Sequence, residues 1–454
     1  MRDWEEEAAA RLAAGAALAD ALDVRSATAW ISLDQGVREE IRWGRIKAPS
    51  HAWLTGRRLH WDWNSPLPTW NPSRTPPSTS ALALALCDPD GRVREAALDR
   101  AWDTAPLLPL VAIRCADWVG PVRERARDVL RAALPGVGPS AMTVLAAVIL
   151  RISGRSRGDA ARAALERALL GGGTAVLEAM LTSEDRATRR LAHRVAVARG
   201  HFPGERLAAI AATDGDVVIQ DICSEAALAT TGPRTTDAVL LALLGSRQGR
   251  VRSAGVTALH RSGRNGEAER FLFDRSGLVR ACARWVLRQA GTDPRAVYRA
   301  RCAGDSVPDH APLGLAECEA RQAAVPLLWE LTRHPAPGVR ASAVAGLCVV
   351  DAVDAVRLLP LLDDPSPRVV RATSTALLPH VDRLPAAELR HRTSAGRPSH
   401  ERKAALRLLQ AQGGPDCLEA ARALTDDPDP EIGARARRMI GQPLAPAQEG
   451  PRRH

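Results

Sequence analysis

The chain has 454 residues, of which 46% are hydrophobic but only 3% aromatic, and its formal net charge is +10. Conspicuous Ala and Leu with so few aromatic residues favour many small helix–helix contacts and disfavour one large aromatic core. Strand-like alternation of Val, Ile, Tyr and Phe is nearly absent, so the sequence predicts an all-α protein.

The basic residues are nearly all arginine, with Lys47 and Lys403 as the lysines. This preference is more typical of an arginine-rich composition than of a surface selected for nucleic acid. A basic chain still allows an anionic partner. Nucleic acid therefore stays open as an alternative to a protein partner.

The eight cysteines are dispersed and form no CxxC pair, so we expect small buried side chains and no metal site. Residues 1–7 are acidic and lack the basic start and apolar core of a signal peptide. The most apolar stretch, residues 141–150, is too short to span a membrane. These features predict a cytoplasmic protein without membrane association.

The first 80 residues differ in composition from the rest. Residues 3–23 and 25–43 each predict an amphipathic helix, and residues 72–80 read as an extended linker rich in Pro, Ser and Thr. Between them lies a tryptophan-rich stretch: Trp43, Trp53, Trp61, Trp63 and Trp70. It is either a cap over the open end of a helical stack or a platform for a ligand.

From residue 81 a pattern with a period near 30 residues predicts a helix, a turn and a second helix. The first core residue of each second helix is followed by small or apolar residues at +3, +4, +7 and +8. We place these anchors at Val93, Val122, Ala161, Thr188, Ile219, Val251, Val279, Val339, Val370, Glu401 and Ile432. A degenerate unit surrounds Pro312. One hairpin cannot bury both its apolar faces, so the prediction is an α-solenoid of about twelve helix pairs over residues 81–442, followed by a disordered tail at 443–454.

The turn sequences resemble those of HEAT-like repeats, especially the short bacterial kind named after phycobilisome lyases. The resemblance rests on residues 88–97, 334–343, 363–372 and 427–432. It implies the fold but no single activity, because that family includes scaffolds, lyases and DNA-binding enzymes. It leaves two alternatives open: a HEAT-like DNA-binding protein or alkylbase DNA glycosylase, and a bilin-lyase-like protein.

An arginine follows the anchor in most units. These residues are Arg94, Arg123, Arg162, Arg189, Arg252, Arg280, Arg340, Arg371 and Arg402. A cation in the first turn of a helix is locally unfavourable, so its recurrence requires a tertiary reason. We interpret the column as an internal ladder that pairs with acidic turn residues of adjacent repeats. The alternative is contact with a phosphate backbone.

The chain has no P-loop, GxSxG, HExxH or Rossmann glycine pattern. We therefore expect no catalytic residue and no cofactor, and we expect a scaffold that binds a partner polypeptide on the concave face formed by the second helices. The predicted contact residues are Arg284, Trp285, Ala341, Val344, Ala345, Ala372 and Thr375. The alternative is that these small residues let neighbouring helices approach closely.

Overall fold

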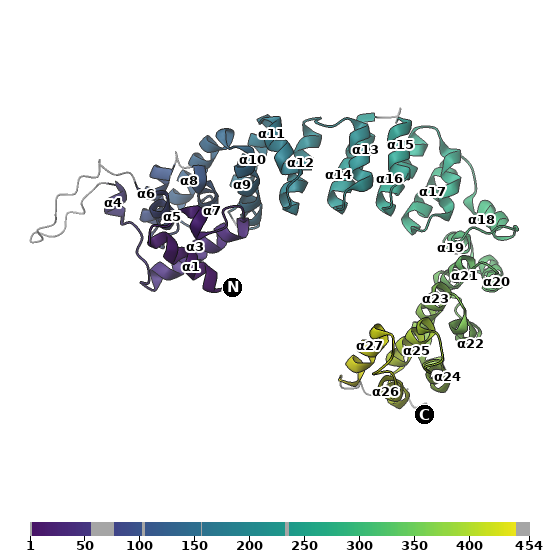
Figure 1. Cartoon of the computed structure of the whole chain (residues 1–454). Coiled ribbons are helices and arrows are strands. Elements are labelled where there is room, and N and C mark those ends of the chain that lie inside the picture. Colours follow the sequence, from purple (N-terminus) through teal and green to yellow (C-terminus); the bar gives the residue numbers. More distant parts are fainter. Residues whose placement is uncertain (1, 56–76, 102–104, 156, 232–235, 442–454) are drawn as a thin grey trace, which may run out of the picture. The chain divides into compact units, whose positions relative to one another are not determined.

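The computed structural model describes residues 2–55, 77–101, 105–155, 157–231 and 236–441, and every regular element among them is a helix (Figure 1). The predicted all-α fold is confirmed. The chain divides into two compact units, residues 1–230 and 231–454. The predicted tail at 443–454 lies outside the described residues, as do Trp61, Trp63 and Trp70.

Five helix pairs form most of unit 1 (Figure 1). They are α5 (Thr79–Leu86) with α6 (Gly91–Ala101), α7 (Leu108–Arg114) with α8 (Gly120–Ala133), α9 (Pro139–Ile152) with α10 (Asp159–Gly171), α11 (Thr174–Leu181) with α12 (Arg186–Ala198), and α13 (Gly204–Thr213) with α14 (Val217–Thr231). Successive first helices from α5 to α11 contact one another, as do successive second helices from α6 to α12.

The described residues of unit 2 contain seven pairs, two of them with a 3-10 helix in the first position. They are α15 (Asp237–Leu244) with α16 (Gly249–Arg261), η3 (Asn265–Phe273) with α17 (Gly277–Gln289), α18 (Pro294–Cys302) with α19 (Ala311–Ala316), α20 (Arg321–Leu331) with α21 (Pro337–Val349), α22 (Ala355–Leu358) and η4 (Leu359–Asp363) with α23 (Pro367–Leu377), α24 (Ala386–His391) with α25 (Ser399–Gln412), and α26 (Gly414–Ala423) with α27 (Pro430–Ile440). The second helices from α19 to α27 contact one another in sequence.

The turn inside most pairs contains a recurring hydrogen bond that ends one helix and starts the next. A side chain two residues before the N-cap of the second helix accepts the N-cap backbone N–H. The Asp364 carboxylate accepts from Ser366 at 2.8 Å, and Asp427 accepts from Asp429 at 2.8 Å. Such a local bond competes with helix continuation and fixes the chain reversal. All eleven predicted anchors are buried.

The N-terminal region packs along unit 1. The predicted helix at 3–23 is two helices, α1 (Arg2–Ala13) and α2 (Leu18–Ala21), separated at Gly15, whose φ of +91° suits glycine. The second predicted helix is α3 (Ala27–Arg42). Helix α1 contacts α5, and α3 contacts α7 and α9, so these helices lie against the first helices of three successive pairs. The predicted boundary at residue 80 therefore lies inside unit 1.

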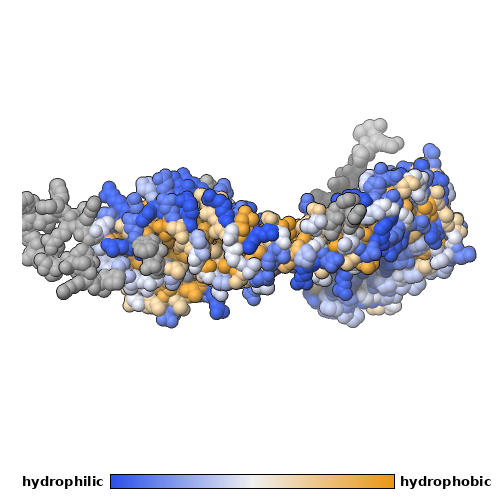
Figure 2. All heavy atoms as spheres, turned by 90° about the horizontal axis from the view of Figure 1, so that it is seen from above, coloured by the Kyte–Doolittle hydropathy of each residue, from blue (hydrophilic) through white to orange (hydrophobic). Residues whose placement is uncertain are grey.

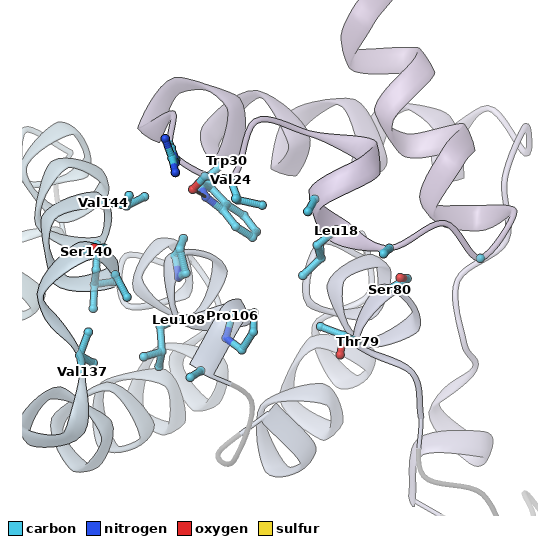
Figure 3. Close-up of a pocket in the computed structure, with 18 residues that line it drawn as sticks. Leu18, Val24, Trp30, Thr79, Ser80, Pro106, Leu108, Val137, Ser140 and Val144 are labelled. Atoms are coloured by element: carbon cyan, nitrogen blue, oxygen red, sulfur yellow. Dashed lines mark hydrogen bonds between the residues drawn. The ribbon is translucent and has the colours of Figure 1, made fainter.

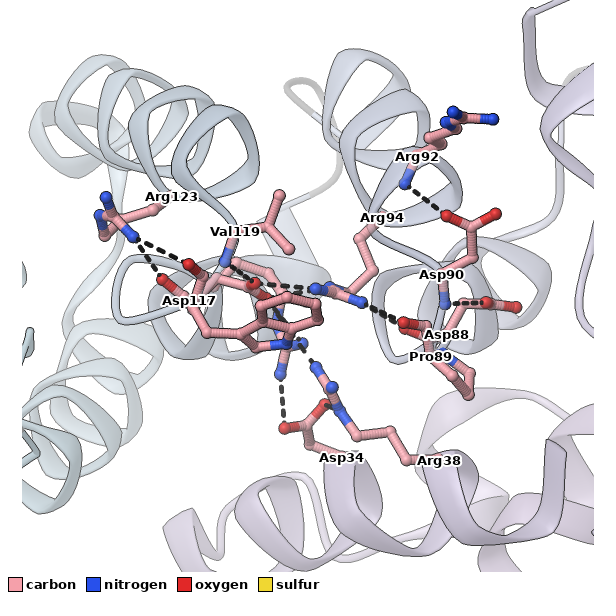
Figure 4. Close-up of polar contacts among 12 residues, drawn as sticks. Asp34, Arg38, Asp88, Pro89, Asp90, Arg92, Arg94, Asp117, Val119 and Arg123 are labelled. Carbon is pink, nitrogen blue, oxygen red and sulfur yellow. Dashed lines mark hydrogen bonds and ion pairs between the residues drawn. The ribbon is translucent and has the colours of Figure 1, made fainter. Parts of the chain in front are cut away.

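A buried network of ion pairs connects α3 to the repeats (Figure 4). Asp34 on α3 pairs with Arg38 at 3.1 Å and with Arg114 on α7. Arg114 also reaches Asp117 at 3.2 Å, and the same Asp117 binds Arg94 on α6. Several partners share each charge, which a buried ion needs to offset its lost hydration.

Candidate partner-binding surface

The arginine column makes a defined set of bonds, of which Arg340 is representative. Its Nε and Nη2 donate to the two carboxylate oxygens of Asp364, both at 2.8 Å. Its Nη1 donates to the carbonyls of His334 at 2.9 Å and Pro335 at 2.8 Å. One guanidinium thus joins the turn of its own repeat to the acidic turn residue of the next repeat.

Four further arginines bind an acid in the same forked way. The pairs are Arg94 with Asp117, Arg252 with Asp274, Arg280 with Glu317, and Arg402 with Asp427. Burial raises the pKa of Asp274, but hydrogen bonds from Arg252 and the Ser276 N–H, together with the charges of Arg252 and Arg275, outweigh burial and hold the pKa below its ordinary value. These five guanidinium groups are directed into the protein and are not available to a ligand.

The other four arginines of the column differ. Arg123 and Arg189 donate to the carbonyl six residues earlier, at 2.8 and 3.1 Å, without an acidic partner among the described residues. Arg162 is half-buried and pairs with Glu166 on its own helix. Arg371 is exposed and has no side-chain bond to any described residue.

The assignment of Arg371 to the ladder is wrong, because Arg371 lies one residue beyond the ladder position in α23. The first core position of α23 is Val369, three residues after the N-cap Ser366, and Val370 occupies the position that Arg340 has in α21. Both valines are buried. Arg371 consequently lies one position further on, at the exposed surface.

The predicted groove needs a second correction. Ala341 and Val344 on α21 are 5% and 0% exposed, so neither can contact a partner. Helix α21 lies between α19 and α23. A Cβ at Gly346 would crowd Leu328 and Ala316, which shows how closely the helices approach. At these positions small residues serve helix packing.

The remaining predicted residues lie at or near the surface. Ala345 and Ala372 are half-buried and Thr375 is exposed. Arg284 is held by Glu317 at 2.6 Å. Trp285 is 43% exposed and packs edge-to-face on His260 of the preceding second helix, with ring centroids 5.1 Å apart.

A cationic surface on the last three second helices was missed from the sequence. We call it the arginine face, and it consists of Arg371 on α23, Arg407 on α25, and Arg435 and Arg438 on α27. Arg407 donates to the Thr375 hydroxyl at 3.1 Å, and Arg435 donates twice to the neutral Gln410 amide oxygen, at 2.8 and 2.6 Å.

The arginine face lacks local neutralisation. None of its four members pairs with an acid among the described residues. The acids of its three helices, Glu401 and Glu431, pair with Arg397 and Lys403. Burial, with the neighbouring Arg407 and Arg438, lowers the pKa of Arg435. Like charges held this close favour an incoming anion.

The neighbouring second helix, α21, carries a different surface. It has no charged side chain after Arg340, and Cys348 and Val349 near its end are exposed, the latter by 52%. Since α21 contacts α23, an uncharged strip borders the arginine face. On the sides in view in Figure 2, hydrophilic side chains are interspersed with hydrophobic ones.

Other chemistry is sparsely represented. Within the described ranges, no three His, Cys, Asp or Glu side chains are grouped as metal ligands would be. Burial raises the pKa of the Cys115, Cys223 and Cys302 thiols to about 12, so these groups are held as thiols. None of the described helices is both long and apolar enough to cross a membrane.

Comparison with known proteins gives structural neighbours at low sequence identity. No family model matches the chain, and no curated protein matches it. An engineered protein aligns over 79% of this chain and 97% of its own, at 16% identity and a TM-score of 0.19. Kap121p aligns over 77% of this chain at 13% identity and a TM-score of 0.31, and the same values hold for Kap121p bound to Ste12p. The aligned part spans 47% of Kap121p.

Proposed function

We propose that this protein is an interaction scaffold that binds a polypeptide on the second-helix side of unit 2. The arginine face carries the proposal, because it presents four cations whose neutralisation the described chain does not supply. The five forked arginines are already satisfied by acids, so a partner has no reason to compete for them. The partner we infer carries a run of Asp or Glu residues.

A polypeptide fits this surface better than a phosphate backbone does. The cations without an acidic partner cover three helices, and the adjoining surface of α21 carries the uncharged residues Ala345, Cys348 and Val349. A segment with acidic residues followed by apolar ones complements both parts, whereas a nucleic acid needs a continuing series of cations. In unit 1, acids such as Glu95, Glu124 and Asp128 belong to the second helices, which also disfavours a long polyanion.

Site-specific photocrosslinking tests the proposal. A photoreactive side chain at Thr375, beside Arg407, should yield a covalent adduct with a polypeptide in the native cell. The same group at Val356, which is 75% exposed on the first helix α22, should not yield that adduct. Adducts that nuclease removes would favour the nucleic-acid alternative, and equal adducts from both positions would reject this surface.

Charge reversal gives the matched binding test. With the captured partner segment as a synthetic peptide, Arg407→Glu and Arg438→Glu should each weaken binding at least tenfold, and the loss should shrink as salt rises. Arg422→Glu, on the first helix α26, is the control and should bind like the parent. Trp285→Ala separately tests whether the partner extends to α17, where we propose the indole as an aromatic anchor.

A further inference from the structure

Unit 1 contains an apolar pocket with a volume of about 730 Å³ (Figure 3). Leu18 of α2, Trp30 of α3 and Val24 in the turn between these helices line it from the N-terminal region. Leu108 of α7 and Val144 of α9 line it from the repeats (Figure 3). A pocket of this size with mostly apolar walls is typical of sites that enclose a small ligand.

Two of the polar groups that line the pocket are committed to the protein. The Ser80 hydroxyl donates to the Ala16 carbonyl at 2.6 Å, and the Trp30 indole N–H donates to the Val24 carbonyl at 3.0 Å. Arg25 is the charged residue of the lining. Its side chain is exposed and has no ion pair or hydrogen bond with the described part of the chain.

We propose that this pocket binds a single-chain amphiphile with a carboxylate head, whose apolar chain fills the cavity and whose carboxylate pairs with Arg25. The apolar walls favour a hydrocarbon body by removing it from water. A carboxylate at the rim needs a donor to offset its lost hydration, and the guanidinium provides a forked one. This inference concerns unit 1 and does not depend on the arginine face of unit 2.

The test uses sodium decanoate and decanol as paired probes in calorimetric titrations of the full chain. Decanoate should bind more tightly than decanol to the parent, since only the carboxylate can use Arg25. Arg25→Gln should weaken the binding of decanoate about tenfold, because it removes one charged hydrogen-bonded pair. The affinity for decanol should stay unchanged. Arg92→Gln is the control, because Arg92 is also an exposed unit 1 arginine but does not line the pocket.

A second variant tests the cavity itself. Ala141 is exposed on α9 and lines the pocket, so Ala141→Phe should fill space without disturbing the core. It should remove the binding of both probes while the circular dichroism spectrum and melting curve stay parental. Unchanged decanoate affinity in Arg25→Gln, or unchanged binding of both probes in Ala141→Phe, would overturn the proposal. A failure of both probes to bind the parent would do the same.

Discussion

Replacing Arg340 by alanine should destabilise unit 2 locally. The substitution removes four hydrogen bonds, two of them to Asp364, in a site where the two side chains are 14% and 6% exposed. Removing one partner of a buried ion pair typically costs about 3–5 kcal/mol. Asp364 keeps its bond from the Ser366 N–H, and some water can enter, so we expect about 2–3 kcal/mol.

The assay is hydrogen exchange of the amides in α21 and α23, because a chain of two compact units need not unfold in one step. Arg371→Ala is the matched control. The Arg371 side chain is exposed and bonds to no described residue, so Arg371→Ala should lower the stability by less than about 0.5 kcal/mol. Equal protection in Arg340→Ala and the parent would refute the reasoning, as would an equal loss in both variants. Arg340→Lys should be intermediate, since an ammonium cannot form the fork.

Two further predictions concern other buried sites. Burial raises the pKa of Asp216, but hydrogen bonds led by Arg190 outweigh it and lower the pKa to about 2. A carboxyl pKa that is lower in the folded state stabilises the fold at pH values above the unfolded pKa of about 3.9. The free energy of unfolding should therefore fall by roughly 2 kcal/mol as the pH falls from about 4 to 2. Asp216→Asn should remove this pH dependence in acid titrations. Gly314→Ala should cost about 1–3 kcal/mol, because its Cβ would overlap the buried ring of Tyr298. Gly171→Ala, which meets open space, should melt like the parent or slightly higher.

The repeat register could be predicted because it depends on local chemistry. A turn residue, an N-cap and a core residue three positions later recur in most units, and this pattern is visible within a single repeat. It failed at α23, where Val369 and Val370 are consecutive and both fit an apolar anchor. Pro367 resolves the choice, since proline is favoured at the first helical position and Pro337 occupies that position in α21.

The surface could not be predicted as well, because exposure depends on how closely helices pack. Ala341 and Val344 occupy helix positions that face outward in a helix with distant neighbours, but α19 and α23 lie against them. The arginine face was missed for a related reason. Whether an arginine on a second helix forms an ion pair depends on which acid reaches it, and for the five forked arginines that acid belongs to another repeat.

The ladder has a rule that allows a designed test. Arg94, Arg252, Arg340 and Arg402 each bind an Asp placed two residues before the N-cap of the next second helix. Arg189 donates to the Ser183 carbonyl and not to Asp214, which has the same place before α14, so this position allows the pair without ensuring it. Arg162 has the same helix position, but the corresponding turn residue of the next pair is Ser183, and the arginine bends back to Glu166.

Ser183→Asp should therefore add the missing pair. The serine is buried, and its hydroxyl already accepts the Asp185 N–H at 3.2 Å, a bond that aspartate makes in the other turns. We expect the free energy of unfolding to rise by about 1 kcal/mol. The new pair adds hydrogen bonds, but it also buries a charge beside Asp185 and displaces Glu166 from Arg162. Urea titration should show the gain, and Arg162→Ala should turn the same substitution into a loss, since the aspartate would then be buried without its cation. If Ser183→Asp destabilises both backgrounds equally, the new aspartate does not pair with Arg162, and the predicted gain is wrong.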